Sequence, residues 1–220
     1  MRKAEKVRKT TETKIKVKLN IDGAGKSKIV TGIDFLDHML TLFSFHGLFD
    51  LTIEAKGDLK IDSHHTNEDL GIVLGQAFKE ALGNKKGIKR YGFSYVPMGE
   101  ALSRVVVDIS GRGELYFTTL LGELPKIREL GLNLKDSSIQ ETMIDFQEKS
   151  GETYHLVDLK SFLESFAKHS GISINVGLLQ KEDTHHQAEA VFKALGIALD
   201  QATRIDLRRK GVPSTKGVID

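Results

Sequence analysis

Two pairs of adjacent histidines, each followed by a glutamate, are the residues of this sequence best suited to chemistry. They are His64, His65 and Glu68 in the first pattern, and His185, His186 and Glu189 in the second. On a helix, spacings of three and four residues place each glutamate beside its histidines. Adjacent histidines differ by about 100° around the helix axis, so each pair is better placed to serve two ions than to chelate one. Imidazole nitrogens and carboxylates without sulfur suit a divalent ion such as Mn²⁺, Fe²⁺ or Zn²⁺.

The two patterns belong to a longer internal repeat. For a single pattern, two surface histidines at the start of a helix would be the favoured interpretation. The duplication argues against that, because identities continue in register through Leu74 and Leu195 and through Gly75 and Gly196. An aspartate precedes each histidine pair, Asp62 in the first and Asp183 in the second. We expect these aspartates to orient a ligating imidazole.

A second repeated segment lies upstream of each pair. It runs from His38 to His46 in the first half and from Ser161 to His169 in the second, so Ser161 is the repeat equivalent of His38. Taken alone, His38 sits among apolar residues and would more often be a core or interface histidine than a ligand.

Hydrophobic periodicity predicts alternating strands and helices in each half. Helical spacing predicts helices at 34–45, 67–82, 159–168 and 187–202. Alternating or short apolar runs predict strands at 14–21, 50–54, 58–61, 103–109, 114–121 and 172–179. This order predicts an α+β fold of two duplicated half-domains, 1–95 and 96–220, each a small β-sheet with helices packed on one face. Residues 124–152 have no counterpart in the first half and are interpreted as an insertion, in which 139–146 could form a short helix.

The composition is that of a globular protein. Of the 220 residues, 40% are hydrophobic and 28% are charged, which excludes a disordered chain. The net charge of +2 gives no electrostatic case for nucleic acid or a membrane surface as partner. The absence of cysteine excludes disulfides and zinc–thiolate sites. Because the sequence has neither a long apolar run nor a secretory signal, we expect a cytoplasmic protein.

Two basic segments could bind an anion. The segment 85–90 is either a solvated turn or an anion site. The segment 213–217 combines hydroxyls, a lysine and a glycine, a composition that can wrap phosphate, although a frayed tail is the alternative.

These features together resemble the imidazoleglycerol-phosphate dehydratase family, which are hydro-lyases of histidine biosynthesis. The matching segments are 10–13 (TTET), 32–39 (GIDFLDHM), 62–69 (DSHHTNED), 87–92 (GIKRYG), 100–104 (EALSR), 108–112 (DISGR), 183–190 (DTHHQAEA) and 213–217 (PSTKG). They span nearly the whole chain outside the insertion.

The resemblance implies a fold like that of ribosomal protein S5 domain 2, and a homo-oligomer, a 24-mer, with two Mn²⁺ per active site at subunit interfaces. The substrate would be D-erythro-imidazole-glycerol phosphate and the product imidazole-acetol phosphate. One ion would take His38, His65, Glu68 and His186, and the other would take His64, His185, Glu189 and a further histidine. The phosphate would meet Arg90, Arg112, Ser214 and Lys216. Glu12 matches a carboxylate that moves protons, which makes Glu12, Glu68 and Glu189 the expected catalytic residues.

The chain departs from the family pattern at three positions besides the insertion. Ser161 and Asn175 replace histidines, and Gly99 replaces an aspartate. Three hypotheses follow. The first is an active dehydratase whose second metal site is altered, with water or His155 in place of the lost ligand. The second is a divergent paralogue with weakened or changed activity. The third is a metal-dependent assembly protein without catalysis. The retained Glu12 and phosphate-binding residues favour the first hypothesis, whereas the changes at Ser161 and Gly99 favour the second.

Overall fold

The structure is a computed structural model that describes residues 2–119, 145–147, 153–180 and 183–219. The first half contains β1 (Lys3–Lys9), β2 (Thr13–Asn20), β3 (Ser27–Val30), α1 (Asp34–Gly47), β4 (Asp50–Gly57) and α2 (His64–Leu82). The second half contains β5 (Tyr91–Met98), β6 (Ala101–Asp108), β7 (Leu115–Thr119), α4 (Leu156–Ser170), β10 (Ser173–Gln180) and α5 (Thr184–Thr203). A small two-stranded sheet is formed by β8 (Asp145–Gln147) and β9 (Thr153–His155).

The two halves have the same sheet topology, which confirms the predicted duplication. The first sheet has the order β1-β2-β4-β3 and the second has the order β5-β6-β10-β7. In each sheet the fourth strand of the order runs parallel to its neighbour, as β3 does to β4 and β7 does to β10. The other strand pairs of both sheets are antiparallel.

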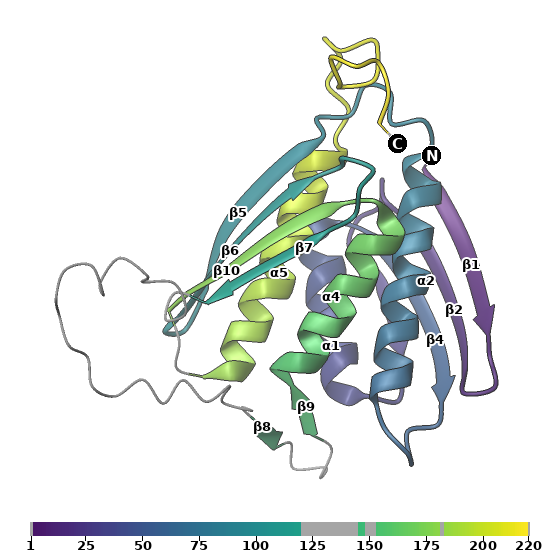
Figure 1. Cartoon of the computed structure of the whole chain (residues 1–220), viewed down its shortest axis with the longest axis vertical. Helices are drawn as coiled ribbons and strands as arrows, with labels where there is room; N and C mark the ends of the chain where they lie inside the picture. The colour runs from purple at the N-terminus through teal and green to yellow at the C-terminus, as the bar shows by residue number, and fades with distance from the viewer. Residues whose placement is uncertain (1, 120–144, 148–152, 181–182, 220) are drawn as a thin grey trace, which may run out of the picture.

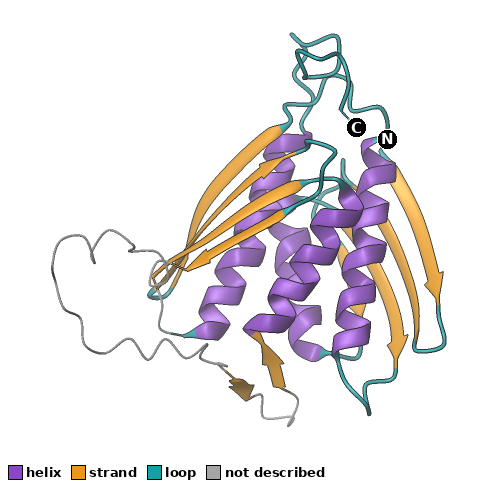
Figure 2. Ribbon diagram, viewed as in Figure 1, coloured by secondary structure: helices purple, strands orange, loops and turns teal. Residues whose placement is uncertain are grey.

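The helices lie between the two sheets, and each helix pair joins one half to the other (Figures 1 and 2). The α2 helix covers the first sheet and packs on α4, whereas α5 covers the second sheet and packs on α1. The same glycine of the repeat makes the close approach in both pairs. A Cβ on Gly196 would lie 2.6 Å from the carbonyl oxygen of Phe43, and a Cβ on Gly75 would lie 2.7 Å from that of Phe166.

The strand pattern follows from alternating residue types. In β2 the side chains of Ile15, Val17 and Leu19 are buried, while the lysines between them face outward. Because successive strand residues point to opposite faces, this alternation buries one face of the sheet beneath the helices. The histidine patterns at the starts of α2 and α5 are thereby fixed at the same end of the helical layer (Figure 1).

The structure corrects several expectations about the strands. Residues 58–61, predicted as a strand, form a turn in which the Ile61 amide donates to the Asp58 carbonyl at 2.7 Å. The strands β1, β3 and β5 were not predicted; β1 buries only Ala4, so its sequence carries no clear alternation. The short helix expected at 139–146 lies mostly outside the described residues, and its last two positions belong to β8.

Candidate functional site

A three-residue cluster joins α1 to α5. The Nε2 atoms of His38 and His185 lie 3.3 Å and 3.1 Å from the same carboxylate oxygen, Oε1 of Glu189. The potential ligand atoms of all three side chains lie within 4.8 Å of one another. Two imidazole nitrogens and a carboxylate, without sulfur, form a donor set that fits a divalent ion such as Mn²⁺ or Zn²⁺.

Glu189 is the buried member of this cluster. Its side chain is 8% exposed, whereas those of His38 and His185 are nearly half exposed. Burial alone would raise the pKa of the Glu189 carboxyl, but its ion pair with Lys193, at 2.6 Å, and its contact with His38 hold the pKa below its ordinary value. The carboxylate is therefore charged at neutral pH and can bind a cation.

The first histidine pattern is more open. The Nε2 atom of His64 lies 3.5 Å from Oε2 of Glu68, and both side chains are nearly half exposed. The neighbouring His65 turns toward a different carboxylate, with its Nδ1 atom 3.1 Å from Oδ2 of Asp58. This hydrogen bond raises the pKa of the His65 ring above its ordinary value.

Within one chain, the residues expected to bind each metal ion do not group as the resemblance implied. That grouping placed His38 with His65, Glu68 and His186, whereas the structure places His38 with His185 and Glu189. The Nδ1 atom of His186 instead lies 3.2 Å from Oε1 of Glu100, which raises the pKa of the ring.

The aspartates that precede the pairs accept backbone amides at the helix starts, and Asp183 is the N-cap of α5. Oδ1 of Asp183 accepts the backbone amides of His185 and His186, at 2.7 Å and 3.3 Å. Oδ1 of Asp62 accepts the amide of His64 at 3.0 Å. Such hydrogen bonds satisfy amides at a helix start that have no partner within the helix. Asp62 and Asp183 thus contact the backbone of the histidine pairs.

Glu12 is held at the site by a rigid turn between β1 and β2. The Oγ1 atom of Thr10 accepts the amides of Glu12 and Thr13, at 3.1 Å and 2.9 Å. Asp69 of α2 ties this turn down through hydrogen bonds from Arg8 and Thr13. The Glu12 carboxylate lies 4.0 Å from Nδ1 of His65, so the predicted proton-transfer group is beside the first histidine pattern.

An aromatic bridge that sequence reasoning missed connects the two patterns. The ring of Phe35 lies 5.2 Å from that of His185 and 5.1 Å from that of Tyr154, measured between centroids. The buried Tyr154 hydroxyl donates to Oδ1 of Asn67 at 2.9 Å. No local pattern in the sequence pointed to Tyr154, which follows the insertion and reaches α2 only through the tertiary fold.

The predicted phosphate-binding residues gather at the opposite end of the molecule. The Arg90 guanidinium pairs with Asp108 at 2.7 Å and donates to the carbonyl of Pro213 at 2.9 Å, so Arg90 holds the loop that carries Ser214 and Lys216. The hydrogen bond to Asp108 raises the pKa of Arg90. Arg112 lies in the same region, in the turn that follows β6.

The distance between the two groups follows from α5. The Arg90 amide donates to the carbonyl of Ala202, near the end of α5, whereas His185 lies at its start. At a rise of about 1.5 Å per residue, the intervening helix spans about 25 Å. The C-terminal loop lies at one end of the helical layer and the histidine patterns at the other (Figure 1). A single chain therefore does not bring the histidine patterns and the predicted phosphate-binding residues together.

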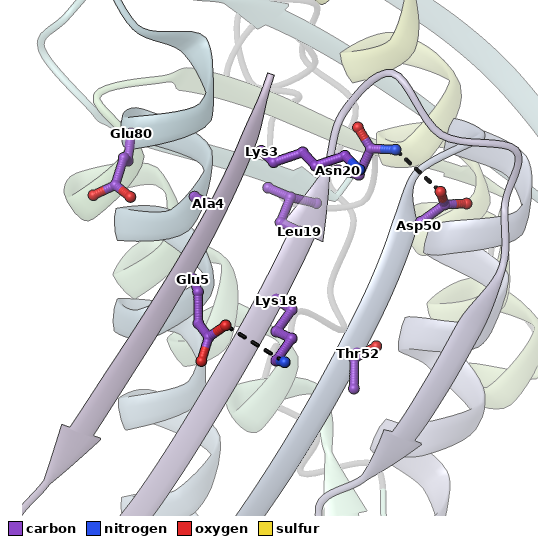
Figure 3. A pocket seen from close by; sticks show the side chains of 9 residues that line it. All are labelled: Lys3, Ala4, Glu5, Lys18, Leu19, Asn20, Asp50, Thr52 and Glu80. Atoms are coloured by element: carbon purple, nitrogen blue, oxygen red, sulfur yellow. Dashed lines mark hydrogen bonds and ion pairs between the residues drawn. The ribbon is translucent and has the colours of Figure 1, made fainter. Parts of the chain in front are cut away.

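The outer face of the first sheet carries a polar hollow away from both groups (Figure 3). Most of its charged side chains pair with each other or with neighbours, as Glu5 does with Lys16 and Lys18, and Asn20 donates to Asp50 at 3.1 Å. Because these partners satisfy one another, the hollow is a solvated surface and offers no reactive group.

In the part of the chain that the structure describes, no helix is long and apolar enough to cross a membrane.

The helix packing indicates what a histidine at position 161 would meet. Gly75 meets α4 as Gly196 meets α1, so the repeat predicts that position 161 on α4 lies toward the first histidine pattern as His38 on α1 lies toward the second. Within the described residues, no third imidazole or carboxylate joins His64 and Glu68 in a compact cluster. The side chain of His155, a possible substitute, lies outside the described part of the structure.

Ser161→His is therefore expected to create a second three-residue cluster. Calorimetric titration should show that the variant binds Mn²⁺ at this second site at least about tenfold more tightly than wild type does. This gain in affinity is comparable to that from a residue that hydrogen-bonds to a metal ligand. Lys160→His is the matched control, since it adds the same ring on another face of α4. An equal gain in Mn²⁺ affinity in both variants, or no gain in Ser161→His, would contradict the equivalence of position 161 and His38.

Comparisons with known proteins agree with one another. The family model described as imidazoleglycerol-phosphate dehydratase matches residues 31–156 and 127–199. A protein of that name from Thermoanaerobacter pseudethanolicus is 52% identical over 219 residues, covering all of both chains. One from Bacillus subtilis is 48% identical over the same length and coverage.

Solved structures give the same result. The dehydratase from Pyrococcus furiosus, solved in complex with (S)-C348, aligns with a TM-score of 0.72 at 34% identity, covering 97% of this chain and 99% of that chain. The dehydratase from Staphylococcus aureus aligns with a TM-score of 0.70 at 33% identity, covering 93% of this chain and 99% of that chain.

Proposed function

Because the chain belongs to the imidazoleglycerol-phosphate dehydratase family, we propose that its histidine–glutamate clusters hold the divalent metal for that reaction. The protein is a hydro-lyase of histidine biosynthesis that converts D-erythro-imidazole-glycerol phosphate to imidazole-acetol phosphate. The carbon next to the imidazole ring loses its hydroxyl and the neighbouring carbon loses a proton. The resulting enol then becomes the ketone of the product.

The observation that carries the metal proposal is the cluster of His38, His185 and Glu189. These residues come from helices in different halves of the chain, yet their ligand atoms lie within 4.8 Å of one another. A bound divalent ion would supply a Lewis acid for the substrate. We propose Mn²⁺ as that ion, with a second ion at His64 and Glu68 of the first pattern.

The remaining residues have distinct proposed roles. Glu12, beside His65, would carry the proton that leaves the substrate carbon. Arg112, Ser214 and Lys216 would bind the phosphate, while Arg90 positions the loop through its contact with Pro213. Holding the phosphate fixes the reacting carbons relative to the carboxylate.

We further propose that each active site is shared between copies of the chain in a homo-oligomer, a 24-mer. The separation of about 25 Å along α5 supports this, because a small substrate cannot span it within one chain. The metal-binding end of one copy would then meet the C-terminal loop of another. A phosphorylated metabolite as substrate supports the cytoplasm as the location.

Titration calorimetry tests the metal proposal. Metal-stripped protein should bind Mn²⁺ at the cluster, and Glu189→Gln should weaken that binding by about 100-fold or more, since it removes the charged ligand. Glu164→Gln, on the exposed side of α4, is the control for the change in charge. Equal binding by wild type and Glu189→Gln would contradict the assignment.

A further inference from the structure

The two histidines of each pair have different partners. The first histidine turns Nε2 toward the glutamate of its own helix, at 3.5 Å for His64 and 3.1 Å for His185. The second histidine turns Nδ1 toward a carboxylate outside the helix. This partner is Asp58 for His65, at 3.1 Å, and Glu100 for His186, at 3.2 Å.

The two outside carboxylates do not correspond to each other in the repeat. Asp58 directly follows β4, in the turn that leads to α2, whereas Glu100 lies in the connection between β5 and β6. Glu100 instead has Glu12 as its equivalent, since the β5–β6 and β1–β2 connections occupy the same place in the two sheets, and the two carboxylates lie 3.2 Å and 4.0 Å from Nδ1 of the second histidine. In the first half Asp58 makes the closer contact, so in both halves Nδ1 of the second histidine faces a carboxylate at hydrogen-bonding distance.

The chemistry of this contact decides where the ring proton lies. An ionised carboxylate only accepts hydrogen bonds, so the ring nitrogen that faces it carries the proton. In a neutral imidazole the other nitrogen, Nε2, then keeps its lone pair and can bind a metal. A carboxylate behind a ligating histidine fixes both the tautomer and the direction of the ring.

We propose that Asp58 and Glu100 are positioning residues of the metal site, holding His65 and His186 with the proton on Nδ1 and presenting Nε2 to the metal. The inference rests on the metal role proposed above. It also separates the two acidic groups near His65. Asp58 is at hydrogen-bonding distance from Nδ1, while Glu12 is 4.0 Å away and remains available for the substrate proton.

Gly99 lies against the ring that Glu100 contacts. It adopts a positive φ of 54°, and a Cβ at this position would lie 3.2 Å from Nδ1 of His186. A side chain at 99 would crowd the ring atom that Glu100 contacts. The same Glu100 oxygen accepts the amide of Asp183 at 3.1 Å, which ties the β5–β6 connection to the start of α5.

Ring NMR of the assembled, metal-free protein tests the inference directly. With ¹³C,¹⁵N-labelled histidine, magic-angle-spinning spectra at a pH where the rings are neutral should show the Nδ1–H tautomer for His65 and His186. Asp58→Ala and Glu100→Ala should shift the respective ring toward the mixture of an unrestrained imidazole. Signals are assigned from the spectra of His65→Gln and His186→Gln.

Calorimetry with Zn²⁺ gives the second readout. The alanine variants should bind the ion about 10–100-fold more weakly. Asp58→Asn and Glu100→Gln, which keep an acceptor oxygen, should stay within a few-fold of wild type. Glu5→Ala, on the first sheet, is the control.

Three results would overturn the positioning role. They are Nε2–H tautomers in the wild type, unchanged tautomers in the alanine variants, and equal losses of affinity in the alanine and amide variants. If wild type takes up no metal, the proposed metal function fails, while the tautomers of the metal-free protein still decide whether Asp58 and Glu100 set the rings.

Discussion

Replacing Glu12 with glutamine is expected to lower kcat by about 10²–10⁴-fold, the range for losing a positioned proton-transfer group. Glutamine keeps the size of the side chain but cannot carry the proton. The turn that holds Glu12 is fixed by Thr10 and Asp69, whose contacts do not involve the Glu12 carboxylate. The fold and the metal affinity should therefore stay as in wild type. Steady-state turnover of imidazoleglycerol phosphate and a parallel Mn²⁺ titration measure the two quantities.

Glu5→Gln is the matched control for Glu12→Gln. Glu5 lies on the strand that leads into the same turn, and it pairs with Lys16 and Lys18 on the outer face of the sheet. It should retain wild-type turnover. A Glu12→Gln variant that turns over at the wild-type rate would remove Glu12 from the mechanism. One that loses Mn²⁺ affinity as well would show that the residue acts on the metal site instead.

Co-assembly of two inactive variants is expected to restore activity. Glu189→Gln removes a metal ligand and Lys216→Ala removes a phosphate contact, so each variant alone should lose at least about 10²-fold in kcat/KM. If the two groups of one site come from different chains, random mixing at equal amounts leaves about a quarter of the sites intact, because each half is drawn independently. Co-expression with two affinity tags, followed by tandem purification, yields the mixed assemblies.

The mixed assembly has a clear control. The two variants purified separately and combined without exchange of subunits should remain inactive. Recovery near a quarter of wild-type turnover supports the shared site. Activity no higher than that of the single variants would mean that both groups act within one chain, and would contradict the separation of about 25 Å along α5.

The sequence was informative where a pattern is local and repeated. The helices in the described part of the chain were all predicted, because apolar residues recur at helical spacing along each of them. The duplicated α+β architecture followed from identities in register around the two histidine pairs. The β1 strand was missed because it is an edge strand whose residues are mostly exposed. The turn at 58–61 was taken for a strand because short apolar runs do not separate these alternatives.

The site was predictable in its residue types but not in its contacts. His38 meets His185 and Glu189 because α1 packs on α5 across the two halves, and no local spacing encodes that pairing. The aspartates that precede the histidines in sequence accept backbone amides at the helix starts, while Asp58 and Glu100 reach the rings through the tertiary fold. The residues close to the histidines in sequence therefore bond to backbone amides, whereas residues distant in sequence contact the histidine rings.

Turnover of imidazoleglycerol phosphate by metal-stripped protein, with and without added Mn²⁺, tests the central claim most directly. The cluster of His38, His185 and Glu189 predicts no product from the stripped protein and restored formation of imidazole-acetol phosphate when Mn²⁺ returns. The assembled state should be checked in both samples, so that loss of the oligomer is not mistaken for loss of chemistry. Undiminished turnover after complete removal of metal would contradict the account, as would absent turnover from assembled protein that has bound Mn²⁺.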